Sequence, residues 1–305
     1  MCGIYDDRHL KMRVNMLKKI LGSHNLPHIV FIRLQSTYPS LKSAERKAAD
    51  FLLHNADRVA VCNISEVANM AGCSEATLVR LAKRLGFMGF PELRDVITSK
   101  QESTETIYEE ILPDDKNSDV IRKVFNASIR SIEDSLNMLD MDQFSKAVKA
   151  LCKANRIQFV GSGDATAAAL AGFSKFARIG VNSFFSNEFD VQLIHASLLS
   201  AGDVLVAISY SGRTRTVLDV VKRARLSKAT VIAITNFPSS PLIKNSDLQL
   251  ISAAFLQNTV GEVMIKRIPE LCLIESLYIA YTLHQSAKII PYLSNTDEAL
   301  KANKQ

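Results

Sequence analysis

The sequence has no continuous apolar run that approaches the ~20 residues a helix needs to cross a bilayer, so we expect no transmembrane segment. Its first stretch, MCGIYDDRHLKMRVNMLKKILG, is basic and partly amphipathic, but it lacks both a continuous apolar core and a small-residue cleavage site. This stretch is therefore not typical of a secretory signal peptide. We expect a cytoplasmic protein that has no membrane partner.

The sequence also lacks any paired arrangement of cysteines. No C-x-x-C pair occurs, and no histidine stands at ligand spacing from the five scattered cysteines, which are Cys2, Cys62, Cys73, Cys152 and Cys272. This spacing argues against both a zinc site and a disulfide framework. We expect reduced cysteines, no bound metal ion and no cofactor.

An excess of positive charge is missing from two thirds of the chain. The 305 residues carry 37 Lys and Arg against 31 Asp and Glu, a net charge of +6. Residues 1–100 hold fifteen basic and nine acidic residues and account for all of this excess, whereas residues 101–305 hold twenty-two of each. Because clustered basic residues chiefly engage backbone phosphates, the first third is predicted to bind a polyanion.

Helical periodicity predicts a small all-α domain over residues 28–100, which follows an extension, 1–27, with a helical stretch at about 8–21. Ser43 is expected to cap the helix that begins there. A second helix is expected from Ile64, and the tight turn Ala71-Gly72-Cys73 joins it to a third. Two short helices joined in this way indicate a helix-turn-helix motif over about residues 64–83.

The third helix carries a candidate DNA-binding face. Its leucines form one apolar side, and the opposite side is expected to hold polar and basic residues near the edges of bases in a major groove. The residues predicted to bind DNA are Ser74, Glu75, Thr77, Arg80, Lys83 and Arg84. The alternative is an ordinary solvated face of a helical bundle. The aromatic residues Phe87 and Phe90 are expected in the core rather than against bases.

Residues 101–119 hold seven acidic residues and one lysine, which predicts a linker that avoids DNA. An α/β domain is expected over 120–290, and a C-terminal tail over 291–305. The α/β domain begins with amphipathic helices at 120–139 and 144–155. The expected strands are Ile157–Val160, Val181–Phe185, Val204–Ile208, Thr230–Thr235 and Leu248–Ser252. The expected helices are Thr166–Ala177, Phe189–Leu199, Thr214–Leu226 and Pro269–His284. This alternation predicts a parallel five-stranded sheet flanked by helices.

Two turns of small residues are candidate ligand sites. In DVLVAISYSGRTRT, an apolar strand ends at Ser209 and a helix begins near Thr214, so backbone N–H groups and hydroxyls point toward one place, where phosphate fits best. Gly163 and Thr166 belong to a similar turn after the first strand. Because ligands bind at the carboxyl ends of parallel strands, the two turns are expected to face one crevice. The alternative is that the serines only cap the helix.

Together, the two halves resemble the RpiR family of bacterial transcription regulators, in which a helix-turn-helix domain precedes a sugar isomerase (SIS) domain. The stretches that carry this resemblance, over about residues 28–290, include ISEVANMAGCSEATLVRLAKRLGFMGFPELR, VGSGDATAAA and GDVLVAISYSGRT. The resemblance implies a regulator of carbohydrate metabolism that binds a DNA operator, senses a sugar phosphate and forms a homodimer or homotetramer. It also implies that Ser209, Ser211, Gly212 and Thr214 hold the phosphate.

The chain departs from the family pattern at two places. Ala165, preceded by Asp164, stands where the family usually has a serine, and a carboxylate there would repel a phosphate. We therefore expect the phosphate on the Ser209–Thr214 turn, with Asp164 accepting a hydrogen bond from a sugar hydroxyl. Glu270 replaces a glutamine that is common in the family, which leaves the identity of the effector open.

Parts of the sequence suggest two alternative functions. An aldose–ketose isomerase of phosphosugars needs a base beside the sugar, and Glu188, Asp190, His195 and Glu270 are candidates. Nothing in the sequence requires catalysis, however, and a basic helix-turn-helix has no purpose in a plain isomerase, so we expect a regulator and not an enzyme. Dinucleotide binding at Gly161-Ser162-Gly163 is disfavoured because Thr166 replaces the third glycine of the fingerprint. The last helix is apolar on nearly all sides and is expected to pack against a partner copy.

Overall fold

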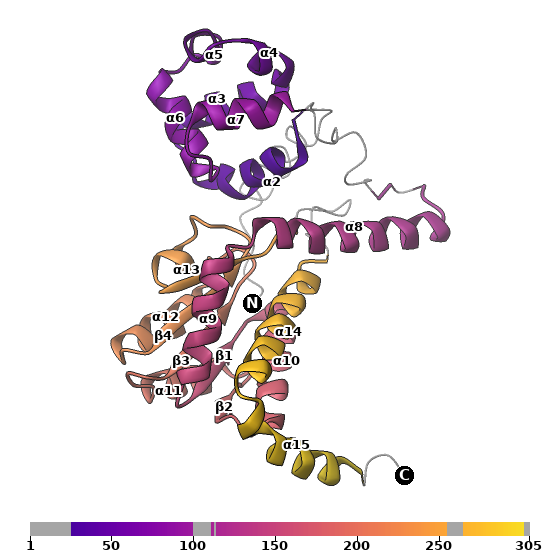
Figure 1. Ribbon diagram of the computed structural model, residues 1–305, viewed down its shortest axis with the longest axis vertical. Helices are drawn as coiled ribbons and strands as arrows, with labels where there is room; N and C mark the ends of the chain where they lie inside the picture. Colours follow the sequence, from indigo (N-terminus) through magenta and orange to yellow (C-terminus); the bar gives the residue numbers. More distant parts are fainter. Residues whose placement is uncertain (1–25, 100–110, 113, 255–264, 302–305) are drawn as a thin grey trace, which may run out of the picture. The chain divides into compact units, whose positions relative to one another are not determined.

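The structure is a computed structural model that describes residues 26–99, 111–112, 114–254 and 265–301 (Figure 1). These residues form two compact units. One contains the described residues up to Arg130, and the other contains Ser131–Ala254 and the described residues from Ile265 onward. The division falls inside helix α8, Asn117–Met138. The helix expected at 8–21 and most of the acidic linker lie outside the described residues.

The first unit contains a bundle of short helices (Figure 1). Their bounds are α2 (His28–Thr37), a 3-10 turn η1 (Tyr38–Ser40), α3 (Ser43–His54), α4 (Ala56–Val61), α5 (Ile64–Ala71), α6 (Glu75–Arg84) and α7 (Phe90–Thr98). The aromatic residues Phe87 and Phe90 are buried, as predicted. Ser43 is not the cap of α3, because the N-cap is Lys42, whose backbone N–H donates to Glu45 Oε2 over 2.9 Å.

Helices α5 and α6 confirm the predicted helix-turn-helix arrangement. A capping box begins α5: Asn63 Oδ1 accepts from the N–H of Glu66 at 3.0 Å, and Glu66 Oε2 accepts from the N–H of Asn63 at 2.9 Å. Gly72 ends α5 with a φ of 63°, and Ser74 caps α6 through the N–H of Thr77 at 3.3 Å. Both ends of the turn are therefore specified by local sequence.

The second unit is a parallel sheet between helices. Its strands are β1 (Ile157–Val160), β2 (Ser183–Phe184), β3 (Val204–Ile208), β4 (Thr230–Thr235) and β5 (Leu248–Ile251), in the order β2-β1-β3-β4-β5. The helices are α9 (Met141–Lys153), a 3-10 turn η2 (Gly163–Ala165), α10 (Thr166–Arg178), α11 (Phe189–Ser197), α12 (Arg215–Leu226), α13 (Pro241–Lys244), α14 (Arg267–His284) and α15 (Ser286–Lys301). The predicted strands and their parallel pairing are confirmed, although β2 is only two residues long and lies at the edge.

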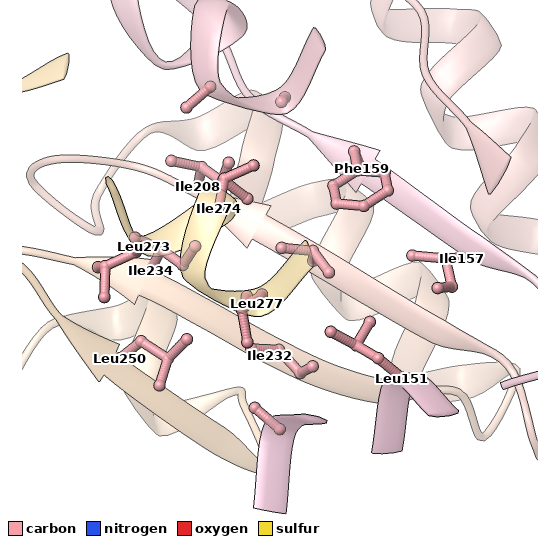
Figure 2. Close-up of a cluster of buried hydrophobic side chains, with 14 of the residues drawn as sticks. Leu151, Ile157, Phe159, Ile208, Ile232, Ile234, Leu250, Leu273, Ile274 and Leu277 are labelled. Atoms are coloured by element: carbon pink, nitrogen blue, oxygen red, sulfur yellow. The ribbon is translucent and has the colours of Figure 1, made fainter. Parts of the chain in front are cut away.

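Alternate residues of the central strands point to opposite faces of the sheet. Ile208, Ile232 and Ile234 pack on one face against α9, α10 and α14, and Figure 2 shows this cluster around Leu151, Phe159 and Ile274. The other face, with Leu205 and Ala207, is covered by α11, α12 and α13. Each fully buried aliphatic side chain stabilises the fold by roughly 1.5–3 kcal/mol. The helices on both faces hold the strands in place and thereby fix the positions of the carboxyl ends of the strands.

The predicted boundary at residue 290 falls inside α15, so much of the expected tail is helical. Helix α15 packs against the end of α10, where Thr296 Oγ1 donates to the carbonyl of Arg178 over 3.1 Å. None of the described helices has the length and apolar character of a membrane-spanning helix. The four cysteines in the described ranges are free, and no group of three or more metal-binding side chains occurs there.

Candidate functional site

The strand order places the two predicted turns side by side. Strands β1 and β3 are neighbours in the sheet, and Val160, at the end of β1, pairs with Ala207. The connections from these two strands lead to opposite edges of the sheet, which makes this a topological switch point, where parallel sheets bind ligands. The turn 161–166 follows β1, and the turn 209–214 follows β3.

The Ser209–Thr214 turn is closed by its own hydrogen bonds. The Ser209 and Thr214 hydroxyls lie 3.0 Å apart, and the N–H of Gly212 donates to the carbonyl of Ser209 over 3.0 Å. Ser209 is buried, with 2% of its surface exposed, whereas Ser211 and Thr214 are half-buried. Ser211 and Thr214 thus remain accessible to a ligand, while Ser209 orients Thr214.

The next strand holds this turn in place. The carbonyl of Tyr210 accepts from Thr235 Oγ1 at 3.0 Å and from the N–H of Asn236 at 3.1 Å. Gly212 adopts a φ of +58°, and a Cβ there would lie 2.2 Å from Ser240 Oγ, the cap of α13. Only glycine fits this position, so the backbone N–H groups at the start of α12 are presented by a rigid support.

Lys266, immediately before α14, joins the two turns. Its Nζ lies 2.5 Å from Asp164 Oδ2 in η2 and 5.9 Å from the centre of the Tyr210 ring. The hydrogen bond from Lys266 is the largest contribution that lowers the pKa of Asp164, so this carboxylate stays ionised. Lys266 therefore offsets the negative charge that would repel a phosphate. Sequence reasoning missed Lys266, although the adjacent pair Lys266-Arg267 at a helix start was a usable signal.

Three of the four residues considered as a catalytic base belong to α11 or to its N-cap, and the fourth, Glu270, belongs to α14. Glu188 and Asp190 are exposed at the start of α11. The His195 ring stacks on Phe184, and burial and the charge of Arg156, which precedes β1, lower the pKa of His195. Of the four, Glu270 shows an electrostatic coupling to Asp164 and Lys266 at the two turns.

The predicted DNA-binding face is only partly exposed. Ser74, Glu75, Arg80 and Lys83 are exposed, but Thr77 is 2% exposed, so its predicted place on the solvent face is wrong. At 100° per residue, Thr77 lies about 40° from Leu81 and thus on the apolar side. The Thr77 hydroxyl lies 2.9 Å from Ser74 Oγ, inside the helix cap.

Arg84 has protein partners that sequence reasoning did not identify. Its guanidinium donates to Glu45 Oε2 at 2.7 Å and to Ser40 Oγ at 2.9 Å. These contacts tie the end of α6 to the start of α3. Arg33 holds the same end of α6, because its Nη1 donates to the carbonyls of Leu85 and Gly86, each at 3.3 Å. Arg84 and Arg33 therefore position α6, and the predicted DNA-binding residues that are exposed are Ser74, Glu75, Arg80 and Lys83.

Replacing Glu45 with alanine is expected to lower the free energy of unfolding by about 1–3 kcal/mol, because the cap of α3 and the partner of Arg84 are lost together. The loss stays below that of a fully buried pair, since the Arg84 side chain is 31% exposed. Glu66→Ala, which removes a capping carboxylate without an ion pair, is the matched control and should cost about 0.5–1 kcal/mol. Thermal and denaturant unfolding measure both, and equal losses would contradict the role of Arg84.

An exposed, basic helix-turn-helix and a separate α/β unit with a ligand-binding edge define a class of proteins, the two-domain transcription regulators. The family model for the helix-turn-helix domain of the rpiR family matches residues 30–103, and that for the SIS domain matches residues 150–266. The chain belongs to the rpiR family of helix-turn-helix (HTH) type transcriptional regulators with an SIS domain. The family prediction made from the sequence is therefore confirmed.

Relatives agree with this assignment over most of the chain. An uncharacterized HTH-type transcriptional regulator of Thermotoga maritima is 32% identical over 252 residues, which are 82% of this chain and 90% of the relative. The HTH-type transcriptional regulator HexR of Pseudomonas aeruginosa is 30% identical over 269 residues, 88% of this chain and 94% of HexR. The Escherichia coli regulator RpiR is 30% identical over 237 residues, 77% of this chain and 80% of RpiR.

Solved structures share the fold. The Vibrio vulnificus NanR protein complexed with ManNAc-6P has a TM-score of 0.57 at 22% identity and covers 90% of this chain and 98% of NanR. The sugar isomerase domain of an RpiR transcription factor from Sphaerobacter thermophilus has a TM-score of 0.54 at 18% identity, over 59% of this chain and 98% of that domain. These identities establish the architecture alone.

Proposed function

We propose that this regulator binds a sugar phosphate at the carboxyl edge of β1 and β3 and that this effector changes its affinity for a DNA operator. One observation carries the proposal: the sheet order brings two small-residue turns together at a switch point, and Lys266 spans them. The structural similarity to NanR, which was solved in complex with ManNAc-6P, supports a sugar phosphate as the ligand.

Each predicted residue has a role in this site. The phosphate rests on the N–H groups of the turn at Gly212 and on the hydroxyls of Ser211 and Thr214, while Ser209 holds Thr214 in place. Gly163 and Thr166 form the neighbouring turn. Lys266 supplies the positive charge beside them, and Asp164 accepts a hydrogen bond from a sugar hydroxyl with its free oxygen, because Lys266 engages only Oδ2.

The DNA half of the proposal places α6 in a major groove. Arg80 and Lys83 are exposed on it, and Ser74 and Glu75 lie at its N-terminal end. Arg80 is assigned to a base edge and Lys83 to a phosphate, since arginine offers the bidentate geometry that guanine requires. Because the partner is DNA, we place the protein in the cytoplasm, and its action is binding rather than catalysis.

A homodimer or homotetramer completes the proposal. Helix α14 exposes apolar side chains along its length: Leu271 is 38% exposed, Ile279 47% and Leu283 75%. Such a stripe is more favourable against a second copy of the chain than against water. A two-fold assembly also lets two α6 helices read half-sites one helical turn apart, so the operator is expected to be a palindrome.

The test combines two measurements on the full chain. Glucose 6-phosphate, fructose 6-phosphate, ribose 5-phosphate and N-acetylmannosamine 6-phosphate are screened for an increase in Tm, with the unphosphorylated sugars as controls. A ligand present at about 100 times its Kd stabilises the folded state by about 2.7 kcal/mol. The sugar phosphate that raises Tm should also change the affinity for an operator selected from a random duplex library. A Tm increase without any change in operator affinity would refute the coupling, and no increase with any sugar phosphate would refute the sensing function.

A further inference from the structure

Glu270 is the most unusual polar residue of the second unit. It lies in the first turn of α14 and is 1% exposed. Neither of its carboxyl oxygens has a hydrogen-bond partner among the described residues. A buried carboxyl without a partner costs free energy, because it has lost its water and gained nothing in return. Its presence indicates a partner that the described residues do not supply.

The position of Glu270 connects this carboxyl to the sugar phosphate site. The start of α14 meets η2 through the bond between Lys266 and Asp164, so Glu270 stands one helical turn beyond the residue that spans the two turns. The charged groups that act on the Glu270 carboxyl are Lys266 and Arg267, at the start of α14, and Asp164 in η2. No other described group contributes to this balance.

We propose that Glu270 binds the effector as a neutral carboxylic acid, which donates one hydrogen bond to a sugar oxygen and accepts another from a sugar hydroxyl. The inference rests on the proposed function and deepens it. A neutral acid offers a donor and an acceptor in one group, as an amide does, but it can lose its donor by ionisation. Glu270 is thereby a specificity-determining residue that makes effector affinity depend on pH.

The environment of Glu270 supports the neutral form. Burial is the largest cause and raises the pKa of Glu270 to about 8, with Asp164 acting in the same direction and Lys266 and Arg267 against it. At pH 7 the carboxyl is therefore mostly protonated. Above pH 8 it becomes an anion beside an anionic ligand, so the affinity falls. Below this range the sugar phosphate loses its second charge near pH 6, which weakens binding from the other side.

The experiment compares full-length wild type with Glu270→Gln and Glu270→Leu by calorimetric titration between pH 7 and pH 9. The probes are the four sugar phosphates of the screen and inorganic phosphate. The affinity of wild type for a bound sugar phosphate should fall about tenfold from pH 7 to pH 9, because a carboxyl with a pKa of about 8 is about nine-tenths protonated at pH 7 and about one-tenth protonated at pH 9. Glu270→Gln should keep the wild-type affinity at pH 7 within about threefold and lose the alkaline decline.

Glu270→Leu should weaken sugar phosphate binding at pH 7 by about tenfold or more and leave inorganic phosphate binding unaffected, since the proposal places Glu270 against the sugar and not against the phosphate. Unfolding curves show whether each variant is folded. If no sugar phosphate binds wild type, the proposed function fails and this inference fails with it. If one binds wild type and Glu270→Gln with the same pH profile, or binds Glu270→Leu as tightly as wild type, the inference alone is wrong.

Discussion

Replacing Gly212 with alanine is expected to destabilise the second unit by about 2–5 kcal/mol and to abolish the response to sugar phosphates. Gly212 has a φ of +58°, which costs a residue with a Cβ about 1–2 kcal/mol. The new Cβ would also lie 2.5 Å from the Cβ of Ser240 and 3.0 Å from Thr235 Oγ1, an overpacking that typically costs 1–3 kcal/mol. The turn must shift to relieve this contact, and the phosphate-binding N–H groups shift with it. Denaturant unfolding and the Tm screen measure the two effects.

Gly163 provides the matched control. It has almost the same φ, +61°, but a Cβ built there meets nothing within 4 Å. Gly163→Ala should therefore cost only the conformational part, about 1–2 kcal/mol, and leave the Ser209–Thr214 turn intact. If the two substitutions destabilise the protein equally, the contact with Ser240 does not constrain the turn. If Gly212→Ala retains the full Tm increase with sugar phosphate, the phosphate does not rest on this turn.

The fold was accessible from the sequence because its elements are specified by local patterns. Val204–Ile208 reads as a continuous apolar run, which is typical of a parallel strand covered on both faces, and β3 has these bounds. Helix α12 begins one residue later than predicted, with Thr214 as its N-cap. The helix-turn-helix was equally local, since Ser74 and Gly72 mark its turn. In contrast, α15 contains Pro291 and follows α14 almost directly, so no stop and start signals separate the two helices.

The site was accessible only in part, because side-chain partners depend on contacts between distant segments. Asp164 and Lys266 are about a hundred positions apart, and no periodicity links them. Thr77 and Arg84 were predicted on the face opposite the leucines, but they lie within about 20° of each other on the border of the apolar side. There Arg84 reaches Glu45 of α3. A basic side chain on such a border can bind either the protein or its partner, and only the fold decides between them.

Two separate variants, Ser211→Asp and Arg80→Ala, should each lose one of the two binding activities, sugar phosphate binding and operator binding respectively. Ser211 is half-buried and accepts only from the N–H of Arg213 at 3.2 Å among the described contacts, so aspartate fits without loss of a core interaction. Its charge would face the phosphate directly and should weaken sugar phosphate binding by at least a hundredfold, because a buried like-charge contact costs several kcal/mol. Operator affinity without effector should remain within about threefold.

Arg80→Ala should give the opposite result. The exposed guanidinium has one described side-chain contact, Thr77 Oγ1 at 3.3 Å, so its removal leaves the stability of the first unit nearly unchanged. Loss of a base contact should weaken operator binding by about 10- to 100-fold and reduce sequence preference, while the Tm increase with sugar phosphate is retained. Fluorescence anisotropy with specific and random duplexes measures both the operator affinity and the sequence preference.

Each variant is the control for the other, because a misfolded protein would lose both activities. If Arg80→Ala binds the operator as wild type does, α6 does not read the groove through this residue. If Ser211→Asp keeps the effector response, the effector lies elsewhere on the sheet edge.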